Sequence, residues 1–370
     1  MSTFNPPSID PILARSETAR LPQPSPAEQP DAPRKLKSVR SSEVLEGLGS
    51  LLAALVLGLT VCWFLSWHGL MGPSLVVALL FVGIFSVVVR ESSGAEAAAD
   101  RVANVLIAVV AITAVLPLVA MVGFVAVKGI TALRPGFFFE DMAKVGPLDK
   151  GGGGLHAIIG TLEQVGIASV VSIPLAFLSA VYLNEMKGHL AGYVRFLVDA
   201  MSGVPSIVAG LFVYAAWVIG LKKGFSGFAG SLALIVLMLP TITRTSEEVL
   251  RTISDNLREA SLALGAAQWR TVLGVVLPTA RSGLITATLL GVARAVGETA
   301  PMLLTARGSS ATNGNPLKDQ QSDLPLFIYQ LLRQPNKAQQ DRAFTGALIL
   351  MLMVGLLFTL ARLVGTSRRK

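Results

Sequence analysis

Charged residues are scarce in this chain. Asp, Glu, Lys and Arg make up 15% of its 370 residues, whereas soluble domains usually contain about 25%. This shortage excludes an ordinary soluble globular protein, because 52% of the residues are hydrophobic and a single core cannot bury them all. Alternating segments of strand length are also absent, which disfavours a β-barrel.

Cysteine and histidine are rarer still. Cys62 is the only cysteine, which excludes an intrachain disulfide and a cysteine-built metal site. The three histidines are spread over different segments, so we expect no metal site. No serine stands in a pattern with a histidine and a carboxylate that would predict hydrolysis. We therefore expect no catalytic residue, no enzymatic activity and no cofactor on this chain.

The apolar residues gather in windows of close to 20 residues, the length of helix that crosses about 30 Å of hydrocarbon. The sequence therefore predicts an all-α, polytopic helical membrane protein with about eight transmembrane helices. Their expected ranges are 46–66, 70–89, 102–127, 156–183, 198–220, 229–243, 279–305 and 343–364.

The basic residues predict the orientation of these helices. The net charge of +8 does not indicate a nucleic-acid partner, because Lys and Arg lie at the ends of apolar segments instead of forming one stripe. An even number of spans places both termini on one side of the membrane. With both termini in the cytoplasm, eighteen Lys and Arg residues fall on inside segments and eleven on outside segments, which is the direction of the positive-inside rule.

Five regions are expected along the chain. Residues 1–44 form a proline-rich cytoplasmic tail, which has too little apolar surface to order itself. In chain order, the other four are an additional transmembrane hairpin over 45–100, a transmembrane helix and external loop over 101–155, a transmembrane core over 156–365 with a cytoplasmic loop at 244–278, and a basic cytoplasmic tail over 366–370.

A short amphipathic helix is predicted within the cytoplasmic loop, over residues 256–265. Asn256 can cap its start with Glu259 three residues later, and Gly265 supplies a left-handed stop. Its apolar and small residues recur at helical spacing on one face, namely Leu257, Ala260, Ser261 and Leu264. Such a face suits a groove on a partner protein. From the residues alone, an ordinary surface helix that joins two spans remains the alternative.

Two opposite charges stand four residues apart in the seventh apolar segment. Arg294 and Glu298 would share one helical face, and charges inside the hydrocarbon usually face a cavity and are paired. A guanidinium presents a planar fork that suits oxyanions, so the pair predicts an anion path. A purely structural salt bridge is the alternative. The neighbouring Gly291, Gly297 and Pro301 indicate that the helix bends here.

Several stretches together resemble a known family. Seven loop residues have the spacing of the coupling motif of ABC importer permeases: Glu259, Ala260, Ser261, Gly265, Val275, Leu277 and Pro278. Their residue types depart from the motif at two positions, where Ser261 replaces an alanine and Val275 replaces an isoleucine. Residues 294–301 then resemble the phosphate-import permeases of the PstA type, and so do residues 151–162 and 182–185.

The resemblance implies an ABC-importer (MetI-like) permease core and a permease subunit for inorganic phosphate in the bacterial plasma membrane. It implies that Arg294 and Glu298 line the translocation path, and that the 256–265 helix, with Glu259, Ala260, Ser261, Gly265, Leu277 and Pro278, couples to a separate ATPase. The expected partners are a PstC-type second permease, a PstB-type ATPase dimer that holds ATP and Mg, a PstS-type phosphate-binding protein and membrane lipid.

Three other functions are weighed against this one. A permease for another oxyanion, such as sulfate or molybdate, would share the same architecture. A self-contained anion channel or secondary transporter is expected to show an internal repeat around its site, and the sequence contains none. A membrane scaffold without transport would not need two charges in the middle of a span.

Overall fold

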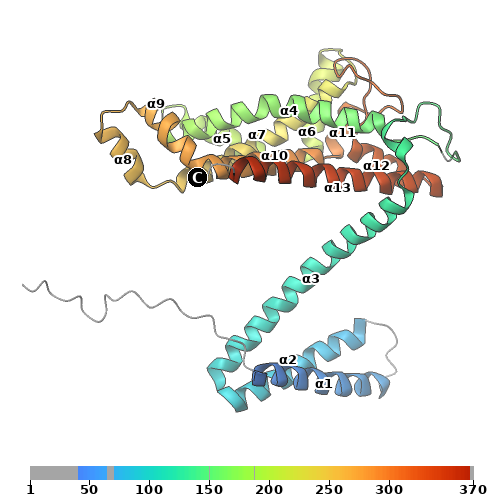
Figure 1. Cartoon of the computed structure of the whole chain (residues 1–370), viewed down its shortest axis with the longest axis vertical. Coiled ribbons are helices and arrows are strands. Elements are labelled where there is room, and N and C mark those ends of the chain that lie inside the picture. The colour runs from blue at the N-terminus through green and yellow to red at the C-terminus, as the bar shows by residue number, and fades with distance from the viewer. Residues whose placement is uncertain (1–40, 65–70, 150, 187, 367–370) are drawn as a thin grey trace, which may run out of the picture. The chain divides into compact units, whose positions relative to one another are not determined.

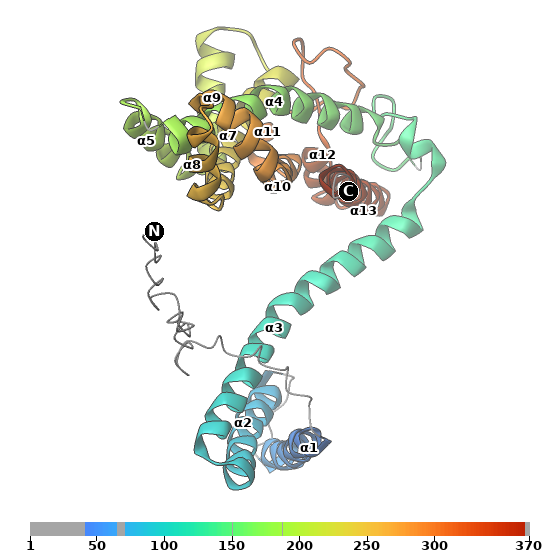
Figure 2. The ribbon, with the colours of Figure 1, turned by 60° about the vertical axis from the view of Figure 1, so that its left-hand side comes forward.

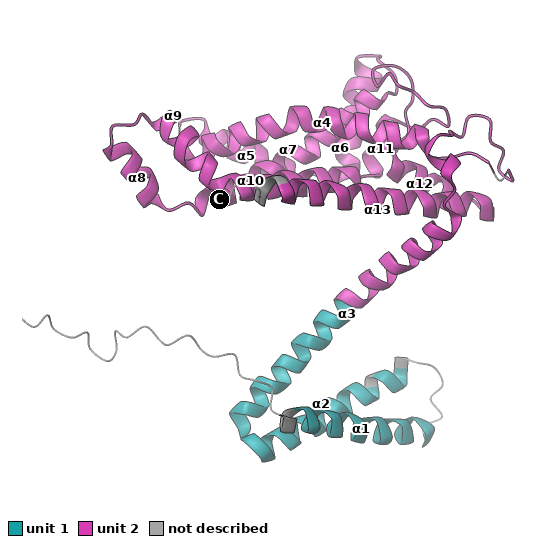
Figure 3. Cartoon of the chain, in the orientation of Figure 1, with its two compact units in different colours: residues 1–114 teal, residues 115–370 magenta. Residues whose placement is uncertain are grey.

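A computed structural model of the chain describes residues 41–64, 71–149, 151–186 and 188–366. Residues 1–40 of the predicted N-terminal tail (1–44) lie outside the described residues. Residues 367–370 of the predicted C-terminal tail (366–370) also lie outside them. Among the described residues the regular structure is helical, with one isolated bridge between Arg307 and Gln321. The chain divides into two compact units, Met1–Ala114 and Val115–Lys370 (Figure 3).

The first unit contains a helical hairpin. Helices α1 (Ser41–Phe64) and α2 (Met71–Ser93) pack against each other, and helix α3 (Ala95–Ala132) begins in this unit and ends in the second. An ion pair joins the start of α1 to the start of α3, with Arg101 Nη1 at 2.8 Å from Glu46 Oε2. The expected hairpin is therefore helical, and its helices are long and apolar enough to cross a membrane.

Long helices that run side by side form the body of the second unit (Figures 1 and 2). These are α4 (Leu155–Val181), α7 (Gly227–Arg251), α10 (Leu277–Val296) and α13 (Lys337–Thr366). Small residues let the helices approach closely. A Cβ atom at Gly291 of α10 would lie only 2.3 Å from Ile242 Cγ1 of α7, so only glycine permits this crossing.

One predicted span is broken in two. The prediction of one continuous helix over 198–220 is wrong. Helix α5 (Ala191–Ser202) is followed by α6 (Ser206–Val213), which continues as the π-helical η4 (Tyr214–Gly220). The two parts meet at 106°. Pro205 causes part of this break: its backbone is extended at ψ 143°, and a proline cannot donate a helical hydrogen bond. The sixth predicted span, 229–243, is too short, since α7 continues to Arg251.

A second break interrupts the seventh predicted span, 279–305. Helix α10 ends at Val296, residues 297–299 are not helical, and α11 (Ala300–Thr305) follows with Pro301 in its first turn. The helix is therefore interrupted at the place where the local glycines and proline indicated a bend. The described helices include seven long and apolar enough to cross a membrane, or eight if the bent α5–α6 pair is one span. That number agrees with the prediction of about eight.

The two ends of this bundle differ. One end carries α8 (Asp255–Ala263), α9 (Gln268–Thr271) and the π-helical η5 (Val272–Val276), and the described end of α13 lies on the same side (Figures 1 and 2). The opposite end carries the long loops and α12 (Leu324–Leu332), which is partly buried against α4 and α13. We refer to these as the α8 end and the loop end of the second unit.

A buried polar contact holds the loop end together. The side-chain amide of Gln321 donates to Glu163 Oε2 at 2.5 Å and accepts from Gln164 Nε2 at 3.1 Å. Both glutamines are almost fully buried. Next to them, a Cβ atom at Gly160 of α4 would lie 1.9 Å from the carbonyl oxygen of Ser322. The chain after α11 is therefore inserted against α4 and is not a free loop.

Candidate functional site

Helix α8 carries the motif that the sequence singled out. It begins one residue earlier than the predicted 256–265 helix and ends two residues earlier, at Ala263. The prediction that Asn256 caps this helix is wrong, because Ser254 has the extended backbone of the N-cap position and Asn256 lies within the first turn. Gly265 has φ +81°, which confirms the left-handed stop, a conformation that glycine adopts without the cost paid by other residues.

One face of α8 is uncovered in this chain. Leu257 and Ala260 are exposed, and Leu264, just after the helix, is more exposed than Leu257, at 89% of its full accessibility. Ser261 is less open because its hydroxyl lies 2.9 Å from that of Thr271 on α9. Glu259 is exposed as well. An exposed leucine face on a short helix that projects from a bundle is the kind of surface that a partner protein covers.

The second half of the motif leads the chain back into the bundle. Leu277 and Pro278 occupy the first turn of α10, directly after η5. Because the chain is helical without interruption from Gln268 to Val296, Pro278 lies inside one long helix just after the π-helical η5, and the amide hydrogen that it lacks removes one helical hydrogen bond there. The loop between the two spans is therefore shorter than the predicted 244–278, since helical structure continues to Arg251 and resumes at Gln268.

Arg294 and Glu298 form the predicted ion pair, although not on one continuous helix. Arg294 Nε lies 3.5 Å from Glu298 Oε1, with Arg294 in the last turn of α10 and Glu298 beyond its end. The arginine side chain is 56% exposed in this chain and the glutamate side chain 16%. The guanidinium thus has room for a second acceptor, and the break beside it leaves backbone groups outside a helix.

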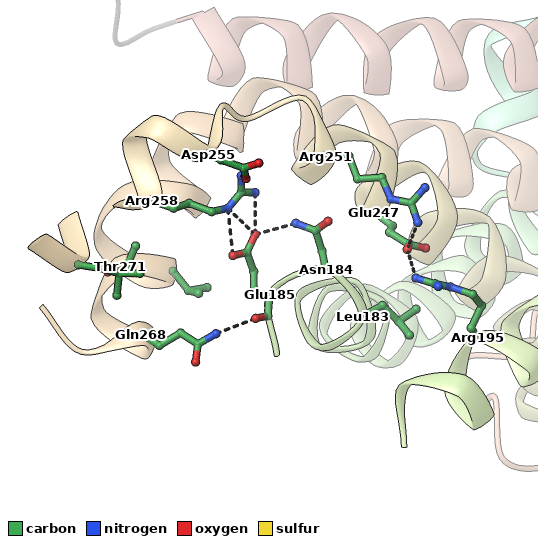
Figure 4. Close-up of a pocket in the computed structure, with 12 residues that line it drawn as sticks. Leu183, Asn184, Glu185, Arg195, Glu247, Arg251, Asp255, Arg258, Gln268 and Thr271 are labelled. Atoms are coloured by element: carbon green, nitrogen blue, oxygen red, sulfur yellow. Dashed lines mark hydrogen bonds and ion pairs between the residues drawn. The ribbon is translucent and has the colours of Figure 1, made fainter. Parts of the chain in front are cut away.

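A group of charged residues lines a polar hollow of about 560 Å³ at the α8 end (Figure 4). The guanidinium of Arg258 on α8 faces the carboxylate of Glu185, which lies on η3 (Tyr182–Met186), the π-helical continuation of α4. The Nη2–Oε1 distance is 2.8 Å, and Nε lies 3.2 Å and 3.1 Å from the two carboxylate oxygens. This is a two-pronged arginine–carboxylate pair, the strongest common geometry for such a bond.

A second charged group lies on the other side of the hollow. The nearly buried carboxylate of Glu247 on α7 accepts from Arg195 of α5 at 2.7 Å and from Arg251 of α7 at 2.6 Å. Both bonds go to the same oxygen, Oε1 (Figure 4). The group ties α5 to the end of α7. Nearby, Arg244 of α7 forms an ion pair with Asp199 of α5.

Sequence reasoning missed these pairings. Residues 182–185 resemble a known family, but this resemblance predicts no role for Glu185, and Arg258 contributes to the sequence prediction only as one of the basic residues on inside segments. The separation of 73 residues between the two leaves no periodic signal. Within the part of the chain that the structure describes, no three His, Cys, Asp or Glu residues are placed to hold a metal ion.

The chain is similar to known transport proteins over most of its length. The family described as "Binding-protein-dependent transport system inner membrane component" matches residues 172–369. "Phosphate transport system permease protein PstA 1" of Mycobacterium tuberculosis is 38% identical over 305 residues, which cover 81% of this chain and 99% of the relative. The PstA protein of Pasteurella multocida is 37% identical over 245 residues, 66% of this chain and 86% of the relative.

One solved structure is described as an inward-facing conformation of the MetNI methionine ABC transporter. Its sequence is 21% identical to this chain, and the TM-score is 0.47. The matched region covers 58% of this chain and 94% of the chain in that structure.

Proposed function

The chain belongs to the inner-membrane components of binding-protein-dependent transport systems, and we propose that it is the permease subunit of an ATP-driven importer of inorganic phosphate. The observation that carries the choice of anion is the relation to PstA permeases, two of which match at 37% and 38% identity. The half-exposed guanidinium of Arg294 supports the same choice, since a planar fork of donors suits a phosphate oxyanion.

The proposed importer contains three further kinds of subunit. A PstC-type permease would form the other half of the translocation path, a PstB-type ATPase dimer would hold ATP and Mg, and a PstS-type protein would deliver phosphate. The exposed face of α8, with Leu257 and Leu264, would seat on the ATPase. Glu259, Ala260, Ser261 and Gly265 on and after α8, with Leu277 and Pro278 at the start of α10, would form the coupling segment.

The proposed orientation places the α8 end of the second unit in the cytoplasm. The described end of α13 lies at this end (Figure 1), and the basic residues that follow it in the sequence favour the cytoplasmic side. The loop end would then face outward, toward the phosphate-binding protein. Both termini would be cytoplasmic if the chain crosses the membrane eight times.

In this proposal Arg294 and Glu298 line the path of the anion. The glutamate holds the guanidinium while the path is empty, and an arriving phosphate competes for it. The break between α10 and α11 allows this exchange without moving a whole span, because residues 297–299 lie outside both helices. A structural salt bridge would instead leave the transport rate unchanged when the arginine loses its charge.

The direct test is transport by the reconstituted complex. The chain is co-expressed with the three partner types and placed in proteoliposomes, and uptake of radioactive phosphate, sulfate and molybdate is measured with and without ATP. We expect ATP-dependent uptake of phosphate alone. Uptake of sulfate or molybdate in place of phosphate would overturn the choice of anion, and phosphate uptake by this chain without the ATPase would favour a self-contained transporter.

A further inference from the structure

Arg258 is bonded to three separate parts of the second unit. Besides its pair with Glu185 of η3, it donates to the backbone oxygens of Leu250, near the end of α7, at 2.9 Å and of Ile253 at 2.6 Å. It also donates to Asp255, on its own helix, at 3.0 Å. Every N–H group of the guanidinium therefore donates to an acceptor, so the side chain has no donor left for a further hydrogen bond.

The environment makes this a strong contact. The side chains of Arg258 and Glu185 are 16% and 7% exposed, so water competes little for their charges. Hydrogen bonds from Arg258 to Glu185 are the main cause that raises the pKa of the Arg258 guanidinium above its usual value. The arginine therefore stays charged.

Helix α8 has few other means of holding the core. None of its nine residues is buried, and none belongs to an apolar core cluster. The loop makes one more polar contact with the same place, because Gln268 of α9 donates to the backbone oxygen of Glu185 at 2.7 Å (Figure 4). Both sides of the loop that carries α8 thus converge on Glu185.

The connections along the chain differ between the helices that lie near α8. Helices α7 and α10 continue directly into the segment that carries α8, so any displacement of α8 reaches them along the backbone. Helix α4 has no such connection, since 73 residues separate Glu185 from Arg258. A displacement of α8 therefore reaches α4 only through noncovalent contacts: indirectly through the packing of α4 against α7, and directly through the bonds that join Glu185 to the segment carrying α8.

We propose that Arg258 and Glu185 form a latch that makes α4 move with α8 when the ATPase closes. This inference rests on the proposed function, in which α8 seats on the ATPase. Glu185 is carried by a π-helical turn, a local widening of the helix that is frequent at functional sites. Both residues are positioning residues, and neither is proposed to touch the transported anion.

The test separates assembly, ATP hydrolysis and transport in one preparation. The whole complex with Glu185→Gln, which keeps the size of the side chain and removes its charge, is compared with wild type in proteoliposomes. The matched control is Asp255→Asn. It removes another carboxylate bonded to Arg258, but Asp255 lies on α8 itself and is 87% exposed, so that bond joins no two elements.

We expect Glu185→Gln to assemble with the ATPase and to hydrolyse ATP, while the phosphate taken up per ATP falls about fivefold or more, the low end of usual coupling between two sites. Asp255→Asn should keep the wild-type ratio. The conservative Glu185→Asp variant should retain more coupling than Glu185→Gln. If Glu185→Gln does not insert, Arg258→Lys replaces it, because lysine keeps the charge and loses the planar fork.

Two results would overturn the latch. One is an unchanged ratio of uptake to hydrolysis in Glu185→Gln, or in Arg258→Lys where that variant replaces it, provided that the variant assembles normally. The other is an equal loss in Asp255→Asn. Failure of the proposed function would look different, because then the wild-type complex would show no ATP-dependent phosphate uptake.

Discussion

Arg294 and Glu298 lie on opposite sides of a helix end and still form an ion pair. The arginine is in the last turn of α10, the glutamate is in the non-helical stretch before α11, and Nε and Oε1 are 3.5 Å apart. Side-chain rotation can separate any such pair, but a pair with one member outside the helix can also separate by rotation of its backbone, which a continuous helix does not permit. This geometry favours a pair that opens during transport over a fixed structural bridge.

The first prediction concerns this arginine. Arg294→Gln should insert normally, keep its partners and lose phosphate uptake, because the amide is uncharged and offers fewer donors to an oxyanion. Uptake of radioactive phosphate by the reconstituted complex measures the effect. Arg281→Gln, nearer the start of the same helix, is the matched control and should transport normally. Uptake that survives Arg294→Gln would assign the pair a structural role.

The second prediction concerns the exposed surface of α8. Glu259→Ala should abolish co-purification of the ATPase and therefore ATP-driven uptake, since Glu259 lies on the helix proposed to seat on it. Pull-down of the ATPase by the tagged permease measures binding directly. Asp255→Ala, one turn earlier on the same helix, should bind the ATPase as wild type does. Equal binding by both variants would contradict the role of Glu259.

The third prediction compares two glycines of α4. A Cβ atom at Gly160 would collide with the carbonyl oxygen of Ser322 at 1.9 Å, whereas one at Gly166 would meet nothing within 4 Å. Gly160→Ala should destabilise the protein by about 1–3 kcal/mol, as overpacking usually does.

The control for this pair should behave in the opposite way. Gly166→Ala should be neutral or stabilising by up to about 1 kcal/mol, because alanine favours the helix. Thermal unfolding of the purified chain in detergent compares the two variants. Cleavage of the loop at 306–323 by protease should also be faster in Gly160→Ala. Equal stability of the two variants would show that the loop is not packed against α4.

The fourth prediction concerns pH at the loop end. Burial raises the pKa of the Asp323 carboxyl from 3.8 to about 7, although its bond from the Leu326 amide at the start of α12 works in the opposite direction. Between these two values the folded protein holds a proton that the unfolded chain has released. The contribution of Asp323 to stability is therefore fully present below pH 3.8 and falls as the pH rises to 7.

Asp323→Asn removes this titration while keeping an oxygen that can cap α12. The variant should gain stability relative to wild type as the pH rises from 4 to 7, by at most about 1.4 kcal/mol per pH unit. Thermal unfolding of both proteins in detergent across this range measures the difference. A difference that stays constant with pH would contradict the raised pKa.

The local features of this protein were predictable because they depend on near neighbours in the chain. Gly265 was expected to end the helix of the coupling motif, and it does so with φ +81°. The interruption of the helix near Gly297 and Pro301 likewise lies where these neighbouring residues indicated a bend. The prediction failed at the 106° turn between α5 and α6, although Pro205 between the two helices is a local signal for part of this break.

The sequence by itself determined that the chain is a bundle of membrane-spanning helices, because apolar segments of about 20 residues in hydrocarbon must satisfy their own backbone hydrogen bonds. It also predicted the short helix of the loop between α7 and α10 and its stop at Gly265. Only the tertiary structure decided that Glu185 meets Arg258 and that Gln321 meets Gln164. Helical periodicity specifies which residues share a face of one helix, whereas contacts between residues 73 and 157 positions apart follow from the packing of whole helices.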